Sequence, residues 1–85
     1  MSKPANTGRA PKAKLDTRGL FCPEPVFRTK SQIDKVSDGD IVEIWADDPG
    51  AEEDISRWTK RTGNALLSIK KEGKDLMFLI QKKAS

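Results

Sequence analysis

The stretch that most constrains this chain is Cys22-Pro23-Glu24-Pro25, which follows Gly19 and holds the only cysteine. A proline fixes φ near the helical value and has no N–H group. Pro23 and Pro25 therefore fit only the first turn of a helix. A residue before a proline favours extended geometry, which predicts Cys22 as the N-cap of this helix. Gly19 allows a sharp bend just before it.

The predicted position of Cys22 favours a reactive thiol. A helix N-terminus carries partial positive charge, which lowers the pKa of a thiol and favours the nucleophilic thiolate. Arg18 is a candidate cationic neighbour, whereas the carboxylate of Glu24 would oppose thiolate formation. Asp16 either braces the intervening loop through a hydrogen bond or is simply exposed. The alternative interpretation is a buried cysteine that packs as a small hydrophobic side chain.

Composition restricts what a reactive Cys22 could do. The 85 residues include one cysteine and no histidine. The chain therefore has no Cys-His nucleophile pair, no resolving cysteine and no ligand set of its own for zinc or an iron–sulfur cluster. We expect no metal and no cofactor, so a reactive Cys22 would have to pass its cargo or its electrons to another molecule.

The same composition gives an expected location. A lone cysteine fits a reducing compartment, and the N-terminus lacks the apolar region of a secretory signal. No apolar run approaches the roughly 20 residues of a membrane span. We therefore expect a cytoplasmic protein without a membrane partner.

The net charge of +3 is unevenly distributed along the chain. Four basic residues and no acids in residues 1–14 contribute +4, which leaves about −1 for the remainder. The polar residues 1–12 are predicted to form a disordered basic arm, and residues 13–83 a single domain. Because the positive charge lies in the arm, we expect no DNA partner and no direct RNA binding by the domain.

Periodicity predicts two helices and four strands. Apolar residues at helical spacing predict helices over residues 23–36 and 49–62. In the second helix Asp48 is the expected N-cap, Pro49 the first helical residue and Gly63 the residue that ends it. β-prone runs predict strands over residues 13–17, 41–46, 65–71 and 75–82.

The last two strands are expected to pair as a hairpin in one of two registers. A Glu72-Gly73 loop would place Leu67 opposite Phe78, and a three-residue loop would place Leu67 opposite Leu79. A slip of one residue reverses which side chains face the core. The sequence leaves both registers open.

The element order βαβαββ predicts an α+β fold, a two-layer α/β sandwich. Strand–helix–strand crossovers are right-handed, so both helices should cover one face of a four-stranded mixed sheet. The other face should stay open and carry Ile41, Trp45 and one set of leucines. It is either an ordinary surface or a docking surface.

The run from Leu15 to Val26 resembles the signature of the TusA/SirA-like sulfur-carrier family, with Leu-Asp, then Gly-Leu, then Cys-Pro-x-Pro. Asp47-Asp48-Pro49-Gly50 and Thr62-Gly63-Asn64 resemble later landmarks, and the similarity covers about residues 13–82. The resemblance implies a two-layer α/β sandwich with a persulfide on Cys22. The basic arm departs from the family pattern.

The resemblance also implies partners. A cysteine desulfurase or a rhodanese-like donor would supply sulfane sulfur. A downstream sulfurtransferase would accept it for tRNA thiolation, cofactor biosynthesis or sulfur oxidation. The chain would then be a carrier in a sulfurtransferase relay and not a stand-alone enzyme.

Two other functions stay open from the sequence. The basic arm and the open sheet face could form a non-catalytic module that binds RNA or protein. Alternatively, Cys22 could form a mixed disulfide with a partner and act as a thiol-based regulator.

Overall fold

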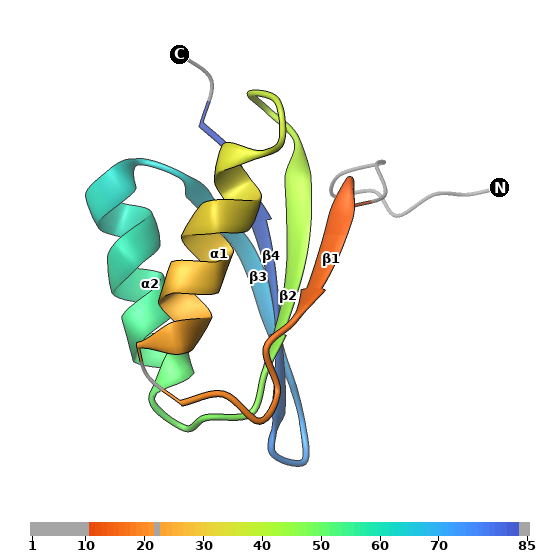
Figure 1. Ribbon diagram of the computed structural model, residues 1–85, viewed down its shortest axis with the longest axis vertical. Helices are drawn as coiled ribbons and strands as arrows, with labels where there is room; N and C mark the ends of the chain where they lie inside the picture. The colour runs from red at the N-terminus through yellow and green to blue at the C-terminus, as the bar shows by residue number, and fades with distance from the viewer. Residues whose placement is uncertain (1–10, 22, 84–85) are drawn as a thin grey trace, which may run out of the picture.

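Two helices cover one face of a four-stranded sheet in the computed structural model, which describes residues 11–21 and 23–83 (Figure 1). The elements are β1 (Ala13–Asp16), α1 (Glu24–Asp34), β2 (Ile41–Ala46), α2 (Ala51–Thr62), β3 (Ala65–Glu72) and β4 (Asp75–Gln81). The predicted βαβαββ order is confirmed, and β2 has the predicted bounds.

The sheet has the strand order β1-β2-β4-β3. β1 pairs with β2 in parallel, whereas β4 pairs with both β2 and β3 in antiparallel fashion. The loop after β1, the connection after β2 and the turn between β3 and β4 consequently lie at the same end of the molecule (Figure 1). That end contains the residues around position 22.

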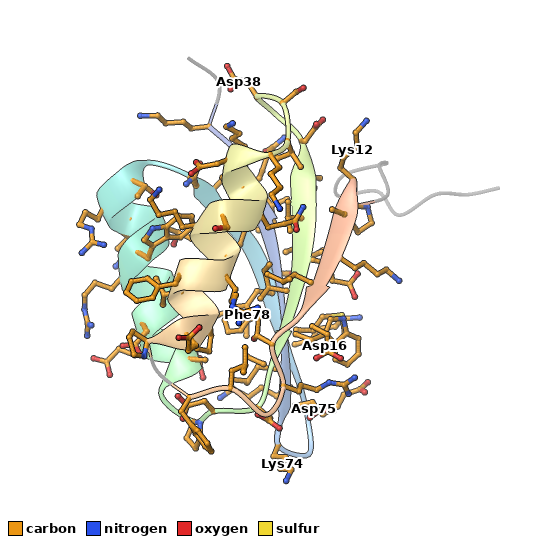
Figure 2. All side chains as sticks on the ribbon, in the orientation of Figure 1. Lys12, Asp16, Asp38, Lys74, Asp75 and Phe78 are labelled. Carbon is orange, nitrogen blue, oxygen red and sulfur yellow. The ribbon has the colours of Figure 1, made fainter. Side chains whose placement is uncertain are left out.

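The core lies between the sheet and the helices. Val42, Ile44 and Ala46 alternate along β2 on the face predicted for the core, and all three are fully buried. Phe78 of β4 is also fully buried and lies between the helices and the sheet (Figure 2). The helices contribute Ile33, Ala51, Ile55 and Trp58, and Leu76 and Ile80 of β4 complete the buried cluster.

The predicted N-cap of α1 is wrong. Pro23 is the N-cap, not Cys22, because the N–H groups of Val26 and Phe27 both donate to the Pro23 carbonyl, at 3.1 and 3.2 Å. The helix therefore begins one residue later than predicted. Cys22 itself lies outside the described residues.

The predicted start of α2 is also wrong. Gly50 is the N-cap, and its carbonyl accepts the Asp54 N–H at 3.1 Å. Asp48 and Pro49 precede the helix, because a bond of 2.9 Å from the Ala51 N–H to the Asp48 carbonyl closes a turn there. The predicted end is confirmed at Gly63, which has φ of 84°.

Neither predicted hairpin register is correct. The loop is Gly73-Lys74 between the paired residues Glu72 and Asp75, which places Ile69 opposite Phe78. A bulge between Leu66 and Ser68 then shifts the register by one. Without a shift, Leu66 and Ile69 would face opposite sides, since they are three residues apart. The bulge lets both pack on the core and leaves Leu67 38% exposed.

The sheet face away from the helices is less open than predicted. Ile41 is only 3% exposed and Glu43 8%, and the Glu43 carboxylate accepts a bond from the half-buried Trp45 indole at 2.5 Å. Among the described residues, neither Ile41 nor Trp45 is an exposed large hydrophobic side chain. Docking through these two side chains therefore has no support here.

The structure describes the domain side of the predicted boundary between the basic arm and the domain, but not most of the arm. The predicted arm falls mainly on residues 1–10, which lie outside the described residues. Lys12 is joined to the sheet, since its N–H donates to the Ile41 carbonyl at 2.6 Å. In the described part of the chain, no helix has the length and apolar character needed to cross a membrane.

We expect Ile44→Val to lower the free energy of unfolding by about 1 kcal/mol, because it removes one buried methylene and leaves a small cavity. Urea unfolding followed by circular dichroism measures the change. Leu67→Ala is the control: although it removes more atoms, it should cost only about 0.5 kcal/mol or less because Leu67 is partly exposed on the bulge. A larger loss for Leu67→Ala than for Ile44→Val would contradict the placement of the core.

Candidate functional site

The loop between β1 and α1 is held to β2 at its first residue. Thr17 is fully buried, and its backbone N–H and its hydroxyl both donate to the Trp45 carbonyl, at 2.7 and 2.6 Å. The Leu20 N–H then donates to the Thr17 carbonyl at 3.1 Å and closes a turn. The loop therefore starts from a fixed point at the end of the parallel strand pair.

Arg18 links the start of this loop to two other elements. Its Nε donates to Asp16 Oδ1 at 3.0 Å and its Nη2 to Asp16 Oδ2 at 2.9 Å, which is a two-point contact. Its Nη1 donates to Asp75 Oδ2 at 3.2 Å, and its guanidinium lies 5.0 Å from the centroid of the Trp45 ring. Asp16 and Asp75 lie close together in Figure 2. The guanidinium of Arg18 is thus paired with one carboxylate at the end of β1 and another at the start of β4.

The same contacts shift the pKa of both partners. Hydrogen bonds from the Arg18 side chain and backbone lower the pKa of Asp16 to about 2. The backbone bond runs from the Arg18 N–H to Asp16 Oδ1 at 3.0 Å. Hydrogen bonds to Asp16 and Asp75 raise the pKa of Arg18 further. Asp16 consequently contacts the first residues of the loop, which is where the sequence suggested a brace.

Gly19 turns the loop with φ of 87°, in the left-handed region that favours glycine. Its N–H donates to Asp47 Oδ1 at 2.9 Å. Asp47 was not among the predicted site residues, although it belongs to the Asp47-Asp48-Pro49-Gly50 run. Its signal was its position directly after β2, because loops that follow two parallel strands leave the sheet at the same edge.

The tip of the loop lies between Leu20 and Pro23. Phe21 is 74% exposed, Pro23 is exposed, and the Phe21 carbonyl accepts the Glu24 N–H at 2.8 Å. Cys22, between them, lies outside the described residues. Both described neighbours of the cysteine are therefore on the surface.

The first turns of α1 hold the other predicted site residues. Pro25 is buried, and its carbonyl accepts the Thr29 hydroxyl at 2.7 Å. The Glu24 carboxylate pairs with Arg28 at 3.3 Å along the exposed side of the helix. The structure thus brings Asp16 and Arg18 together at the sheet, whereas Pro23, Glu24 and Pro25 belong to the helix start.

A shallow hollow lies beside the helix start. It has a volume of about 250 Å³ and is bordered by Pro23, Val26 and Phe27 on one side and by Asp54, Arg57, Trp58 and Arg61 of α2 on the other. Phe27 is 58% exposed. The exposed Phe27 at its border makes the hollow a partly apolar surface beside the helix start.

Residues 11–21 and 23–83 contain no group of three or more metal-binding side chains of the kind supplied by His, Cys, Asp and Glu.

Known proteins similar to this chain match it over most of residues 13–82. The model of the family described as sulfurtransferase TusA matches residues 13–82. A putative sulfur carrier protein, YrkI of Bacillus subtilis, is 44% identical over 68 residues, covering 80% of this chain and 91% of the relative. The sulfur carrier protein TusA of Allochromatium vinosum is 41% identical over 69 residues, covering 81% and 91%.

A solved structure shows the same fold. The crystal structure of a SirA-like protein from Desulfitobacterium hafniense matches with a TM-score of 0.73 at 19% sequence identity. The match covers 85% of this chain and 99% of that protein. At this identity the likeness supports the fold alone.

We expect an NMR titration to give Asp16 a pKa of about 2, and Arg18→Ala to raise it toward the ordinary value of 3.8. The folded pKa is depressed, so the stabilisation from this carboxylate is present above about pH 3.8 and is lost as the pH falls toward 2. Lys30→Ala is the control, because it removes a cation that pairs with Asp34 and not with Asp16. An Asp16 that titrates near 4 in the unmodified protein would contradict the contact with Arg18.

Proposed function

The chain belongs to the TusA family of sulfur carrier proteins, and we propose that it carries sulfane sulfur as a persulfide on Cys22. The observation that supports this site is the exposure of both described neighbours, Phe21 and Pro23, at the tip of a loop held to the sheet. A sulfur atom that is loaded by one protein and unloaded by another needs such a position.

The chemistry needs only one sulfur atom from this chain. The Cys22 thiolate attacks the outer sulfur of a donor persulfide, an S–S bond forms, and the donor cysteine leaves as a thiolate. In the second transfer an acceptor thiolate attacks the outer sulfur on Cys22, and Cys22 leaves as a thiolate. Neither step changes the overall oxidation level, so the chain's lack of histidine and of a second cysteine is no obstacle.

The start of α1 supports the charged forms of this sulfur. The helix has 11 residues and begins two positions after Cys22. Its N-terminus carries partial positive charge, which stabilises a nearby thiolate or persulfide anion. Glu24, which could have opposed that effect, is paired with Arg28.

Family membership implies sulfur-relay partners. We propose a cysteine desulfurase or a rhodanese-like protein as the donor and a downstream sulfurtransferase as the acceptor. That acceptor would serve tRNA thiolation, cofactor biosynthesis or sulfur oxidation. Phe21 and Phe27 are two of the three exposed large hydrophobic side chains among the described residues. Exposed aromatic side chains often contribute much of the binding energy at protein interfaces.

We expect the intact mass to increase by one sulfur atom after incubation with a cysteine desulfurase and cysteine, because the Cys22 thiolate takes the outer sulfur. A rhodanese with thiosulfate is the second donor to be tested. Cys22→Ser should show no adduct, and a reducing agent should remove the adduct from the unmodified protein. Absence of an adduct with both donors would refute the proposed function.

We expect Phe21→Ala and Phe27→Ala each to lower kcat/KM for sulfur transfer from the donor about tenfold, because each removes apolar area that the partner would bury. The rate of Cys22 alkylation by iodoacetamide should change little, since that reagent needs no docking surface. Leu67→Ala is the matched control, as it truncates the third exposed large hydrophobic side chain, on β3. Equal transfer by all four proteins would exclude docking through the phenylalanines.

A further inference from the structure

A carboxylate outside the Cys-Pro-Glu-Pro stretch holds the loop that carries Cys22. Asp47 directly follows β2, and its Oδ1 accepts the Gly19 N–H at 2.9 Å. The bond joins two connections that are 28 residues apart in the sequence. It reaches the loop three residues before Cys22, which is later in the sequence than the points where Thr17 bonds to β2 and Arg18 to Asp75.

The bond from Gly19 to Asp47 acts on the residue of the loop whose backbone has the most conformational freedom. Gly19 has φ of 87°, and a Cβ added there would meet no atom within 4 Å. No side chain packs where a Cβ would lie, so the turn at Gly19 is held by hydrogen bonds: the Leu20 N–H to the Thr17 carbonyl, and its own N–H to Asp47. Glycine also has the greatest backbone freedom of any residue. A hydrogen bond to its N–H is consequently an effective way to fix the direction in which the chain leaves the turn.

The residues after Gly19 depend on that direction. Leu20 closes a turn on Thr17, and the next described backbone bond joins the Phe21 carbonyl to the Glu24 N–H, at 2.8 Å. Rotation about Gly19 would break the bond between Leu20 and Thr17 and shift the backbone of Leu20 and Phe21, whereas Pro23 is fixed as the N-cap of α1.

We infer that Asp47 is a positioning residue for Cys22: its carboxylate oxygen fixes the turn at Gly19 and thereby the direction in which the sulfur is presented to protein partners. This inference rests on the proposed function of Cys22. The neighbouring Asp48 provides a contrast, because its Oδ1 accepts the Gly50 N–H at 3.3 Å within its own connection.

The test uses the single cysteine of the chain for a nitroxide spin label. Electron paramagnetic resonance of the label on Cys22 reports the mobility of the loop directly. We expect Asp47→Ala to increase this mobility, whereas Asp47→Asn, which keeps an acceptor oxygen, should behave as the unmodified protein does. Asp48→Ala removes the same charge one residue away and should also leave the label unchanged.

Sulfur transfer gives the second readout. Because misplacement of a reacting group by about 1 Å can cost up to about a hundredfold in rate, we expect Asp47→Ala to lower kcat/KM for transfer about tenfold. Asp47→Asn should restore the rate, which loss of a charge alone would not allow. If Asp47→Ala fails to fold, Asp47→Glu replaces it. That variant keeps the charge but displaces the carboxylate, so it should show the same loss.

The outcomes separate this inference from the proposed function. Unchanged label mobility in Asp47→Ala, or an Asp47→Asn variant as mobile and as slow as Asp47→Ala, would overturn the role of Asp47. Increased mobility with a transfer rate within about twofold of the unmodified protein would overturn it as well. If the unmodified protein takes up no sulfur, the proposed function fails. The spin label alone then decides whether Asp47 positions Cys22.

Discussion

The parallel pairing of β1 with β2 determines where the site lies. Parallel strands end at the same edge of a sheet, so the loops after β1 and β2 leave the sheet side by side. Only this arrangement lets the Trp45 carbonyl accept two bonds from Thr17 and Asp47 accept one from Gly19. The four residue pairs of β1 and β2 thus fix the path of the Cys22 loop as well as completing the sheet.

Much of the fold was predictable because its signals are local. The alternation along residues 41–46 defines β2 and its buried face, and Gly63 ends α2 in the left-handed conformation that few other residues adopt. The hairpin register was not predictable, because the bulge at Leu67 depends on tertiary packing and not on the local sequence. Leu66 and Ile69 must both reach the core, and only the assembled sheet imposes that.

The site shows the same division between local and long-range signals. Two prolines correctly mark the start of α1. The N-cap is Pro23 and not the predicted Cys22, because the Pro23 carbonyl is the first to accept a helical bond. Arg18 was a candidate cationic neighbour of the thiol, and the structure adds its contacts with Asp16 and with the distant Asp75, of which the second has no local signal. Asp47 was missed because its partner is a backbone N–H in another loop, and only its position directly after a parallel strand pointed to that contact.

The contact between Arg18 and Asp75 has a consequence for how the protein is made. The two residues are 57 positions apart, and Asp75 begins the last strand. During synthesis from the N-terminus, the segment containing Cys22 leaves the ribosome long before Asp75 does. Its full set of contacts can form only when nearly the whole chain is available. A nascent or truncated chain without β4 would therefore lack the contact that Asp75 makes with Arg18 in the loop. The complete set of loop contacts would form only in chains that include β4.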